Sequence, residues 1–229
     1  MGHSINESYD YLFKLLCIGD SNVGKTTFLH KYIYETFSNI RSTLGINIFE
    51  KYITVKDNQR VLLQLWDTVG QERYHSLTTS LYRDSMGFLL IFDLTNESSF
   101  LSIRNWISCI DSFALIDGDL RPPILLIGNK VDLSTHRKID SIRAQQFADE
   151  FHIAYIEICA LTGINIQYAL DTLTDKIFNF MDESMKKYYQ KQPLQLSTNE
   201  NYHHRKISIK LMKNISNVKK RFHALTKRL

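Results

Sequence analysis

The sequence predicts an α/β fold with a mostly parallel sheet and helices on both faces. Apolar runs alternate with segments of helical period from about residue 12 to residue 181, which is typical of stacked βα units. The runs 46–54 and 61–66 are joined by a short polar turn that contains Asp57 and Asn58, which indicates a hairpin. We therefore expect six strands, one of them an antiparallel edge strand, with ligands bound at the carboxyl ends of the parallel strands.

Each expected element is a short apolar run or a longer segment of helical period, taken in chain order. The expected strands cover residues 13–18, 46–54, 61–66, 87–92, 124–127 and 154–158. The expected helices cover residues 25–35, 72–82, 98–113, 141–151 and 166–185. Residues 190–201 are polar, contain Pro193 and lack periodicity, which indicates a linker.

Composition indicates one globular domain with an extension. The 229 residues are 44% apolar and 23% charged, which suits an ordinary hydrophobic core. No apolar run approaches the ~20 residues that span a bilayer, and the start lacks a secretory signal, so we expect a cytoplasmic protein. Cys17, Cys109 and Cys159 have no metal-like spacing and are expected to be buried free thiols.

Charge divides the chain. Residues 183–229 hold 12 lysines and arginines against two glutamates, a balance of +10, so that a total of +4 leaves −6 on residues 1–182. The domain and the basic tail are therefore expected to do different work. We assign residues 1–8 to an N-terminal extension, 9–186 to the domain, 187–202 to a linker and 203–229 to the tail.

A phosphate-binding loop opens at Gly19. The sequence from Gly19 to Thr26 fits G-x-x-x-x-G-K-[ST], and it follows a strand and opens a helix, which argues against a chance glycine-rich turn. Backbone N–H groups and the helix N-terminus bind phosphate, Lys25 reaches the β- and γ-phosphates, and the Thr26 hydroxyl ligates Mg²⁺. The nucleotide-binding residues expected here are Gly19, Asp20, Ser21, Asn22, Val23, Gly24, Lys25, Thr26 and Thr27.

A second motif indicates which base is bound. Asn129, Lys130 and Asp132 directly follow the expected strand 124–127. A carboxylate at Asp132 accepts both the N1–H and the exocyclic amino group of guanine, a donor pair that adenine lacks. An Asn-Lys-x-Asp sequence alone could be a solvated turn, but its place after a strand of a phosphate-loop domain favours guanine recognition.

A third motif follows the strand 61–66. Asp67 is expected to hold Mg²⁺ through water, the Gly70 amide to contact the γ-phosphate, and Gln71 to orient the attacking water. Thr43, just before a strand, is the candidate for a second hydroxyl on Mg²⁺. With Lys25, Gln71 forms the expected catalytic pair.

These motifs, in this order and at these separations, resemble the Ras superfamily, and Trp66 to Arg73 resembles its Rab branch. The stretch 76–97 is similar to the Rab twenty-seven subgroup of secretory vesicles and lysosome-related organelles. The resemblance covers about residues 9–182. It implies a six-stranded Ras-like phosphate-loop fold, GTP or GDP with Mg²⁺ as ligands, a monomer, and effectors, exchange factors and GTPase-activating proteins as partners.

The resemblance also assigns site residues. It implies that Phe37 packs on the guanine and that the loop Cys159, Ala160 and Leu161 contacts the base, with the Ala160 amide addressing the guanine O6. Leu161 replaces the lysine usual in that loop, and it cannot supply a lysine stem beside the base.

Other positions depart from the family pattern. Val69 replaces the usual alanine, and its β-branched side chain restricts a peptide that must reorient at the γ-phosphate. The segment 37–43 is one residue shorter than usual. Ile48 and Leu81 stand where Rab proteins carry effector-facing aromatics, which leaves only Trp66 of that triad.

The tail has no cysteine after Cys159 on which the family's usual prenyl chains would attach. One helical stripe of the tail is apolar, and basic residues occupy much of the remainder. Such a helix binds anionic membranes or partner grooves, and the alternative is a solvated tail. The stripe consists of Leu211, Ile215, Val218, Phe222, Leu225 and Leu229.

Two functions fit the sequence. The first is a GTP-hydrolysing switch of exocytic vesicle traffic, associated peripherally with the cytosolic face of vesicle membranes. The second is a GTP-binding interaction scaffold with impaired hydrolysis, which Val69, the short segment 37–43 and Leu161 favour and Gln71 opposes. Nucleic-acid binding by the tail is not expected, because the tail lacks interleaved aromatic residues and a recognised module.

Overall fold

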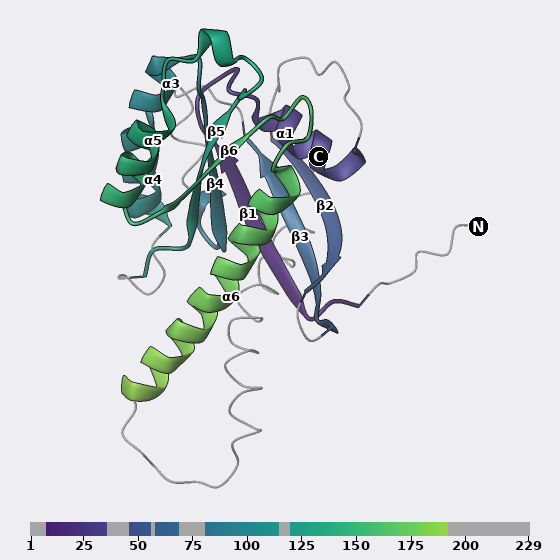
Figure 1. Cartoon of the computed structure of the whole chain (residues 1–229). Helices are drawn as coiled ribbons and strands as arrows, with labels where there is room; N and C mark the ends of the chain where they lie inside the picture. The colour runs from purple at the N-terminus through teal and green to yellow at the C-terminus, as the bar shows by residue number, and fades with distance from the viewer. Residues whose placement is uncertain (1–7, 36–45, 56–57, 69–80, 115–119, 192–229) are drawn as a thin grey trace, which may run out of the picture. The chain divides into compact units, whose positions relative to one another are not determined.

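The computed structural model describes residues 8–35, 46–55, 58–68, 81–114 and 120–191 (Figure 1). The chain divides into two units, Met1–Ile177 and Phe178–Leu229, and each is described by itself. In the described ranges, no helix combines the length and the apolar character that crossing a membrane requires.

The sheet in the first unit has six strands in the order β2-β3-β1-β4-β5-β6. The pair β2 and β3 is antiparallel, and every other neighbouring pair is parallel. The predicted α/β class and the antiparallel edge strand are therefore confirmed. The strands are β1 (Tyr11–Ile18), β2 (Asn47–Thr54), β3 (Arg60–Asp67), β4 (Gly87–Asp93), β5 (Ile124–Asn129) and β6 (Ala154–Ile158).

The helices expected at 25–35, 98–113, 141–151 and 166–185 are found, with two differences. The helix expected at 72–82 lies almost entirely outside the described residues and stays a prediction. The single helix expected at 98–113 is two helices, one ending at Leu101 and the next beginning at Ile103, with Ser102 between them. The last helix continues beyond residue 185 to Lys191, into the stretch assigned to the linker. The helices are α1 (Lys25–Tyr34), α3 (Glu97–Leu101), α4 (Ile103–Phe113), the short 3₁₀ helix η3 (Ser134–His136), α5 (Ser141–Glu150) and α6 (Ile166–Lys191).

Side chains alternate between two buried layers, one on each face of the sheet. Phe88, Leu90 and Phe92 of β4 belong to a hydrophobic cluster with α4 and α5. Gly87, on the other face, lies against Leu173 and Ile177 of α6. Figure 1 shows α4 and α5 grouped on one side of the sheet, away from α1. This sandwich buries both faces, as a parallel sheet requires.

A buried lysine ties β1 to the residues that follow 69–80. Lys14 Nζ donates to Leu81 O at 2.6 Å and to Arg83 O at 2.9 Å. The same ammonium lies 4.6 Å from the centroid of the Trp66 ring, and Trp66 is buried. Burial lowers the pKa of Lys14 to about 8. Trp66, the remaining aromatic of the expected effector-facing triad, is therefore covered in this conformation.

Among the side chains of α6 that the structure describes, Ile177 is the last that is fully buried, and there the first unit ends. The domain was expected to reach residue 186. Residues 178–191 continue the helix, and Ser184 Oγ donates to Phe180 O there. The assignments of a linker and a basic tail beyond residue 191 stay predictions.

Candidate nucleotide-binding site

The candidate site lies at one edge of the sheet. Because β1, β3, β4, β5 and β6 run parallel, their carboxyl ends meet at the same edge. The residues at or directly after these ends are Gly19, Asp67, Asp93, Asn129 and Cys159. The fold therefore brings together three motifs that lie far apart in the sequence.

The phosphate loop joins β1 to α1 and needs glycine at two positions. Gly19 has φ 138° and Gly24 has φ 97°, in the region that favours glycine. A Cβ at Gly19 would lie 2.1 Å from Ile91 O, and one at Gly24 would lie 2.3 Å from Asn129 Nδ2. Asn22 also has a positive φ, of 63°, which asparagine tolerates better than most residues. The loop thus packs directly against the strands that carry the other motifs.

Lys25 begins α1 and points into the loop. Its Nζ donates to Gly19 O at 2.8 Å and to Asp20 O at 2.6 Å. Burial lowers the pKa of Lys25 from its ordinary value, while the nearby Asp67 and Asp20 carboxylates raise it. Lys25, the residue predicted to bind phosphate, is therefore a buried side chain whose Nζ lies beside the start of the loop.

Thr26 and Asp67, two of the residues expected to hold Mg²⁺, lie together. Thr26 Oγ1 donates to Asp67 Oδ2 at 2.6 Å, and Asp67 is fully buried. A hydroxyl and a carboxylate are hard oxygen donors of the kind that Mg²⁺ prefers, usually with water and substrate phosphates as its other ligands. In the described ranges, no three His, Cys, Asp or Glu side chains gather around one point. The donor set fits Mg²⁺ held beside phosphate better than a closed protein cage.

Asn129 joins three loops. Its Nδ2 donates to Val23 O at 2.8 Å in the phosphate loop. Its Oδ1 accepts from Lys130 N at 2.8 Å and from Ala160 N at 3.0 Å. The Ala160 amide, which was expected to address the guanine O6, thus donates to Asn129 in this structure. The asparagine sets the spacing between the loops after β1, β5 and β6.

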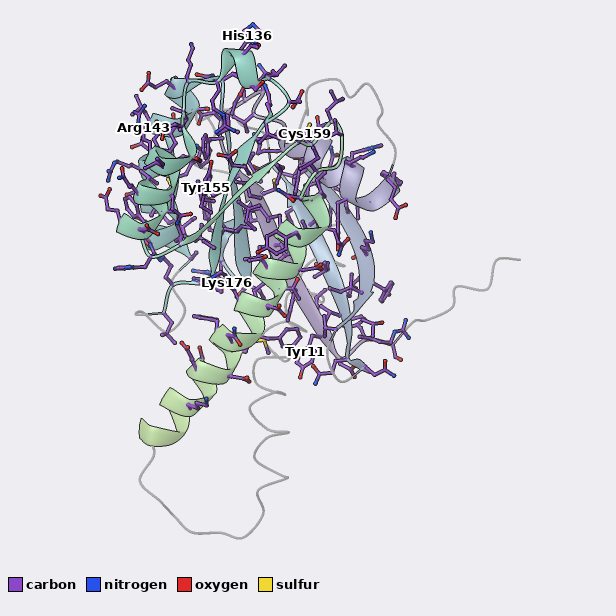
Figure 2. All side chains as sticks on the ribbon, viewed as in Figure 1. Tyr11, His136, Arg143, Tyr155, Cys159 and Lys176 are labelled. Atoms are coloured by element: carbon purple, nitrogen blue, oxygen red, sulfur yellow. The ribbon has the colours of Figure 1, made fainter. Side chains whose placement is uncertain are left out.

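The Asp132 carboxylate is exposed at the same edge. Cys159 Sγ, in the loop after β6 (Figure 2), donates to Asp132 Oδ1 at 3.0 Å and accepts from Thr162 N at 3.3 Å. The buried thiol therefore orients the carboxylate that was predicted to read guanine. Leu161, beside it, is exposed.

Several predicted residues fall outside the described ranges. They are Phe37, Thr43, Val69, Gly70 and Gln71. Their roles at the base, the metal and the γ-phosphate stay predictions. Thr27 lies in the first turn of α1, directly after Thr26.

Two residues of the site were missed. Asp93 ends β4, between the phosphate loop and the loop from Asn129 to Asp132 that is predicted to bind guanine (the guanine loop), and its Oδ2 lies 2.6 Å from Lys130 Nζ. Trp106 Nε1, from α4, donates to Asp20 Oδ1 at 2.8 Å. The signal for Asp93 was available, because it ends an apolar strand as Asp67 does. Trp106 carried none, because only the packing of α4 places it beside the loop.

Comparison with known proteins agrees with this geometry. The model of the Ras family matches residues 14–179, more than half of the chain. The chain belongs to the Ras family. It is 45% identical over 189 residues to the human Ras-related protein Rab-27B, covering 78% of this chain and 85% of the relative. It is also 45% identical to the mouse Ras-related protein Rab-27A, over 78% of this chain and 84% of the relative.

The chain is thus a Rab, similar to Rab-27A and Rab-27B, and a small GTPase of vesicle traffic. Ras-like GTPases generally use Mg²⁺ with GTP. Rab proteins in general bind effectors, exchange factors and GTPase-activating proteins. The resemblance found in the sequence is therefore confirmed for the family and for its Rab-27 branch.

In this Rab an ion pair supports the loop that follows β6. Arg137 donates to both carboxylate oxygens of Glu157 on β6, at 2.9 and 2.6 Å, and Tyr155 Oη donates to Glu157 Oε1 at 2.8 Å. The Arg137 bonds hold the pKa of Glu157 below its ordinary value. Asn165 Nδ2 donates to Glu157 O at 2.8 Å. These contacts fix the end of β6 just before Cys159.

Proposed function

We propose that this Rab alternates between GTP- and GDP-bound states through the site at the carboxyl edge of its sheet, and that it regulates exocytic transport. The observation that carries the proposal is the convergence of Lys25, the pair Thr26–Asp67 and the loop Asn129–Asp132 on one edge. Each group supplies one part of nucleotide recognition: phosphate, metal and base. The exocytic role rests on the similarity to the Rab-27 proteins.

In the proposed reaction the chain positions GTP and stabilises charge. Lys25 binds the β- and γ-phosphates, the phosphate-loop amides bind the remaining oxygens, and Gln71 orients the attacking water. Thr26, Asp67 through water, and Thr43 would hold Mg²⁺, which neutralises charge on the β- and γ-phosphate oxygens when it is bound. Intrinsic turnover is expected to be slow until a GTPase-activating protein completes the site.

Single-turnover hydrolysis tests the enzymatic part of this proposal. The purified full chain is loaded with GTP, and phosphate release is followed with and without a Rab-directed GTPase-activating protein. We expect slow intrinsic release and an acceleration by the activating protein on the order of a thousandfold or more. The same chain with Gln71→Leu is the matched control, and it should show neither the slow intrinsic phosphate release nor its acceleration by the activating protein. Tight GTP binding with no accelerated release would favour the scaffold with impaired hydrolysis.

We also propose that residues 203–229 hold the protein peripherally on anionic, cytosolic membrane surfaces. Each surface-proximal basic residue contributes about 1 kcal/mol on such a leaflet, and the sequence places seven of them around the apolar stripe of the tail. They are Lys210, Lys213, Lys219, Lys220, Arg221, Lys227 and Arg228.

Co-sedimentation with phosphatidylcholine vesicles, with and without phosphatidylserine, tests the tail. The full chain should pellet only with the anionic vesicles, and added salt should release it, because screening weakens surface attraction. A chain ending at residue 202 should stay in the supernatant while it still binds GDP. Equal behaviour of the two chains would exclude the tail as the anchor.

A further inference from the structure

Asp93 is a buried acid beside the proposed guanine loop that none of the expected nucleotide contacts uses. Its side chain is 9% exposed. It ends β4, which lies between β1 and β5 in the sheet, and it is the register partner of Asn129. Its position is therefore fixed by the sheet, between the loop that is proposed to bind phosphate and the loop that is proposed to bind the base.

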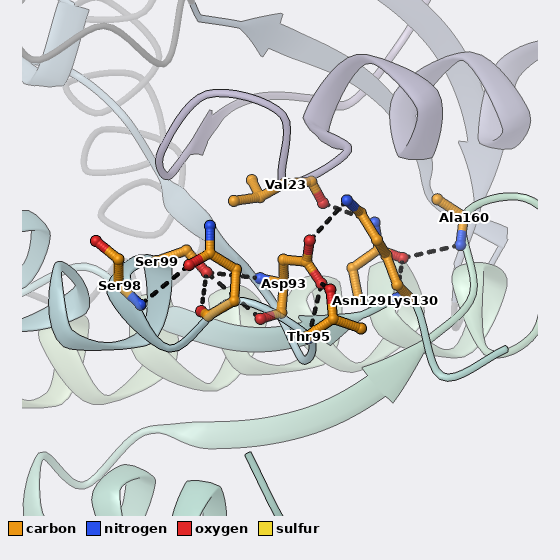
Figure 3. A network of polar contacts seen from close by, with 9 residues as sticks. Val23, Asp93, Thr95, Ser98, Ser99, Asn129, Lys130 and Ala160 are labelled. Atoms are coloured by element: carbon orange, nitrogen blue, oxygen red, sulfur yellow. Dashed lines mark hydrogen bonds and ion pairs between the residues drawn. The ribbon is translucent and has the colours of Figure 1, made fainter. Parts of the chain in front are cut away.

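Both oxygens of the Asp93 carboxylate are engaged (Figure 3). Oδ1 accepts from Thr95 N at 2.8 Å and from Thr95 Oγ1 at 2.7 Å. Oδ2 lies 2.6 Å from Lys130 Nζ. The Asp93 amide donates to Ser99 Oγ at 3.1 Å, which ties the strand end to the first turn of α3. One oxygen thus belongs to the turn before α3, and the other is directed to the guanine loop.

Lys130, which contacts the Asp93 carboxylate, has a strained backbone. Its backbone has φ 73°, a left-handed conformation that is strained for a residue with a side chain. Its amide is held by Asn129 Oδ1 at 2.8 Å, and its ammonium by Asp93. Asn129 in turn contacts Val23 and Ala160. Lys130, a strained residue directly after the asparagine that joins three loops, is therefore anchored at its backbone by Asn129 and at its side chain by Asp93.

We propose that Asp93 is a positioning residue for guanine-nucleotide binding. By holding the Lys130 ammonium it keeps the loop from Asn129 to Asp132 in its strained conformation before the nucleotide arrives. A preorganised loop spends less of the binding free energy on ordering itself, so the nucleotide binds more tightly and leaves more slowly. This inference rests on the proposed function of the site as a guanine-nucleotide site.

Asp93→Asn distinguishes the role of the carboxylate oxygen bonded to Thr95 from that of the oxygen paired with Lys130. The amide oxygen still accepts from Thr95, but the charge opposite Lys130 is gone. We expect the rate constant of GDP dissociation to rise about tenfold, which corresponds to about 1.4 kcal/mol. Because the proposed contact is with the loop from Asn129 to Asp132, the change in GDP dissociation should exceed any change in the hydrolysis of bound GTP. A fluorescent GDP analogue gives the dissociation rate, and single-turnover phosphate release gives the hydrolysis rate.

Glu97→Gln is the matched control. Glu97 is four residues further on, and it pairs with Arg143 of α5 at 2.7 Å, with the two side chains 50% and 41% exposed. The substitution makes the same chemical change and breaks an ion pair at the same turn, but the partner lies outside the guanine loop. GDP dissociation should not change. Equal acceleration by the two substitutions would mean that loosening this turn is sufficient, and would overturn the proposal.

A double-mutant cycle with Lys130→Met tests the route of the effect. If Asp93 acts through Lys130, adding Asp93→Asn to Lys130→Met leaves GDP dissociation unchanged. Additive effects would mean that Asp93 acts through the fold alone. Should Asp93→Asn fail to fold, Thr95→Val removes one donor to the same carboxylate and should accelerate dissociation several-fold, again only while Lys130 is present. Failure of the unsubstituted chain to bind GDP would instead contradict the proposed function.

Discussion

Asp132→Asn is expected to lower the affinity for GDP on the order of a thousandfold and to create affinity for xanthosine diphosphate. The Asp132 carboxylate is exposed at the sheet edge and is oriented by the Cys159 thiol. A carboxylate matches the two donors of guanine, whereas a carboxamide sets its own NH₂ against the amino group of guanine. Xanthine has a carbonyl oxygen at that position, and the carboxamide NH₂ donates to it. Competition against a fluorescent GDP analogue measures both affinities.

The reciprocal gain for xanthosine diphosphate separates base recognition from misfolding, since a damaged protein gains nothing. Asp149→Asn is the matched control, because Asp149 is an exposed carboxylate on α5 whose partner is Gln145. Its GDP affinity should equal that of the unsubstituted chain. If Asp132→Asn retained GDP affinity within about threefold, another residue would have to recognise the base.

Lys25→Ala should weaken GDP and GTP binding at least a thousandfold, and GMP binding much less. In the structure the Lys25 ammonium is buried and donates to the carbonyl oxygens of Gly19 and Asp20, which carry no formal charge. Phosphate oxygens would replace those carbonyls with charge-assisted bonds. Because Lys25 is proposed to reach the β- and γ-phosphates, the loss should grow with the number of phosphates. Isothermal titration with GMP, GDP and GTP checks this order.

Lys31→Ala provides the comparison on the same helix. Lys31 Nζ donates to Glu35 O at the surface end of α1, so the substitution removes the same charge without touching the loop. It should leave all three affinities unchanged. A uniform loss across GMP, GDP and GTP in Lys25→Ala would indicate that the lysine supports the loop rather than the outer phosphates.

Local patterns were sufficient for much of this protein. The glycine spacing around Lys25 needs no tertiary information, because a tight turn before a helix N-terminus binds phosphate by itself. Apolar runs alternating with helical segments likewise determined the α/β class and the antiparallel edge. The break at Ser102 was missed, because the helical segments on its two sides keep almost the same period over 98–113, so the apolar pattern does not show it.

The sequence by itself determined which chemical groups the site has: the loop that opens at Gly19, the Asp132 carboxylate that we propose recognises guanine, and the family to which they belong. Only the tertiary structure decided how these groups are held. Asp93 and Lys130 meet because β4 and β5 are neighbours in the sheet. Trp106 meets Asp20 because α4 packs against β4, next to the phosphate loop. Motifs record residues that are close along the chain, whereas strand order and helix packing bring distant residues into contact.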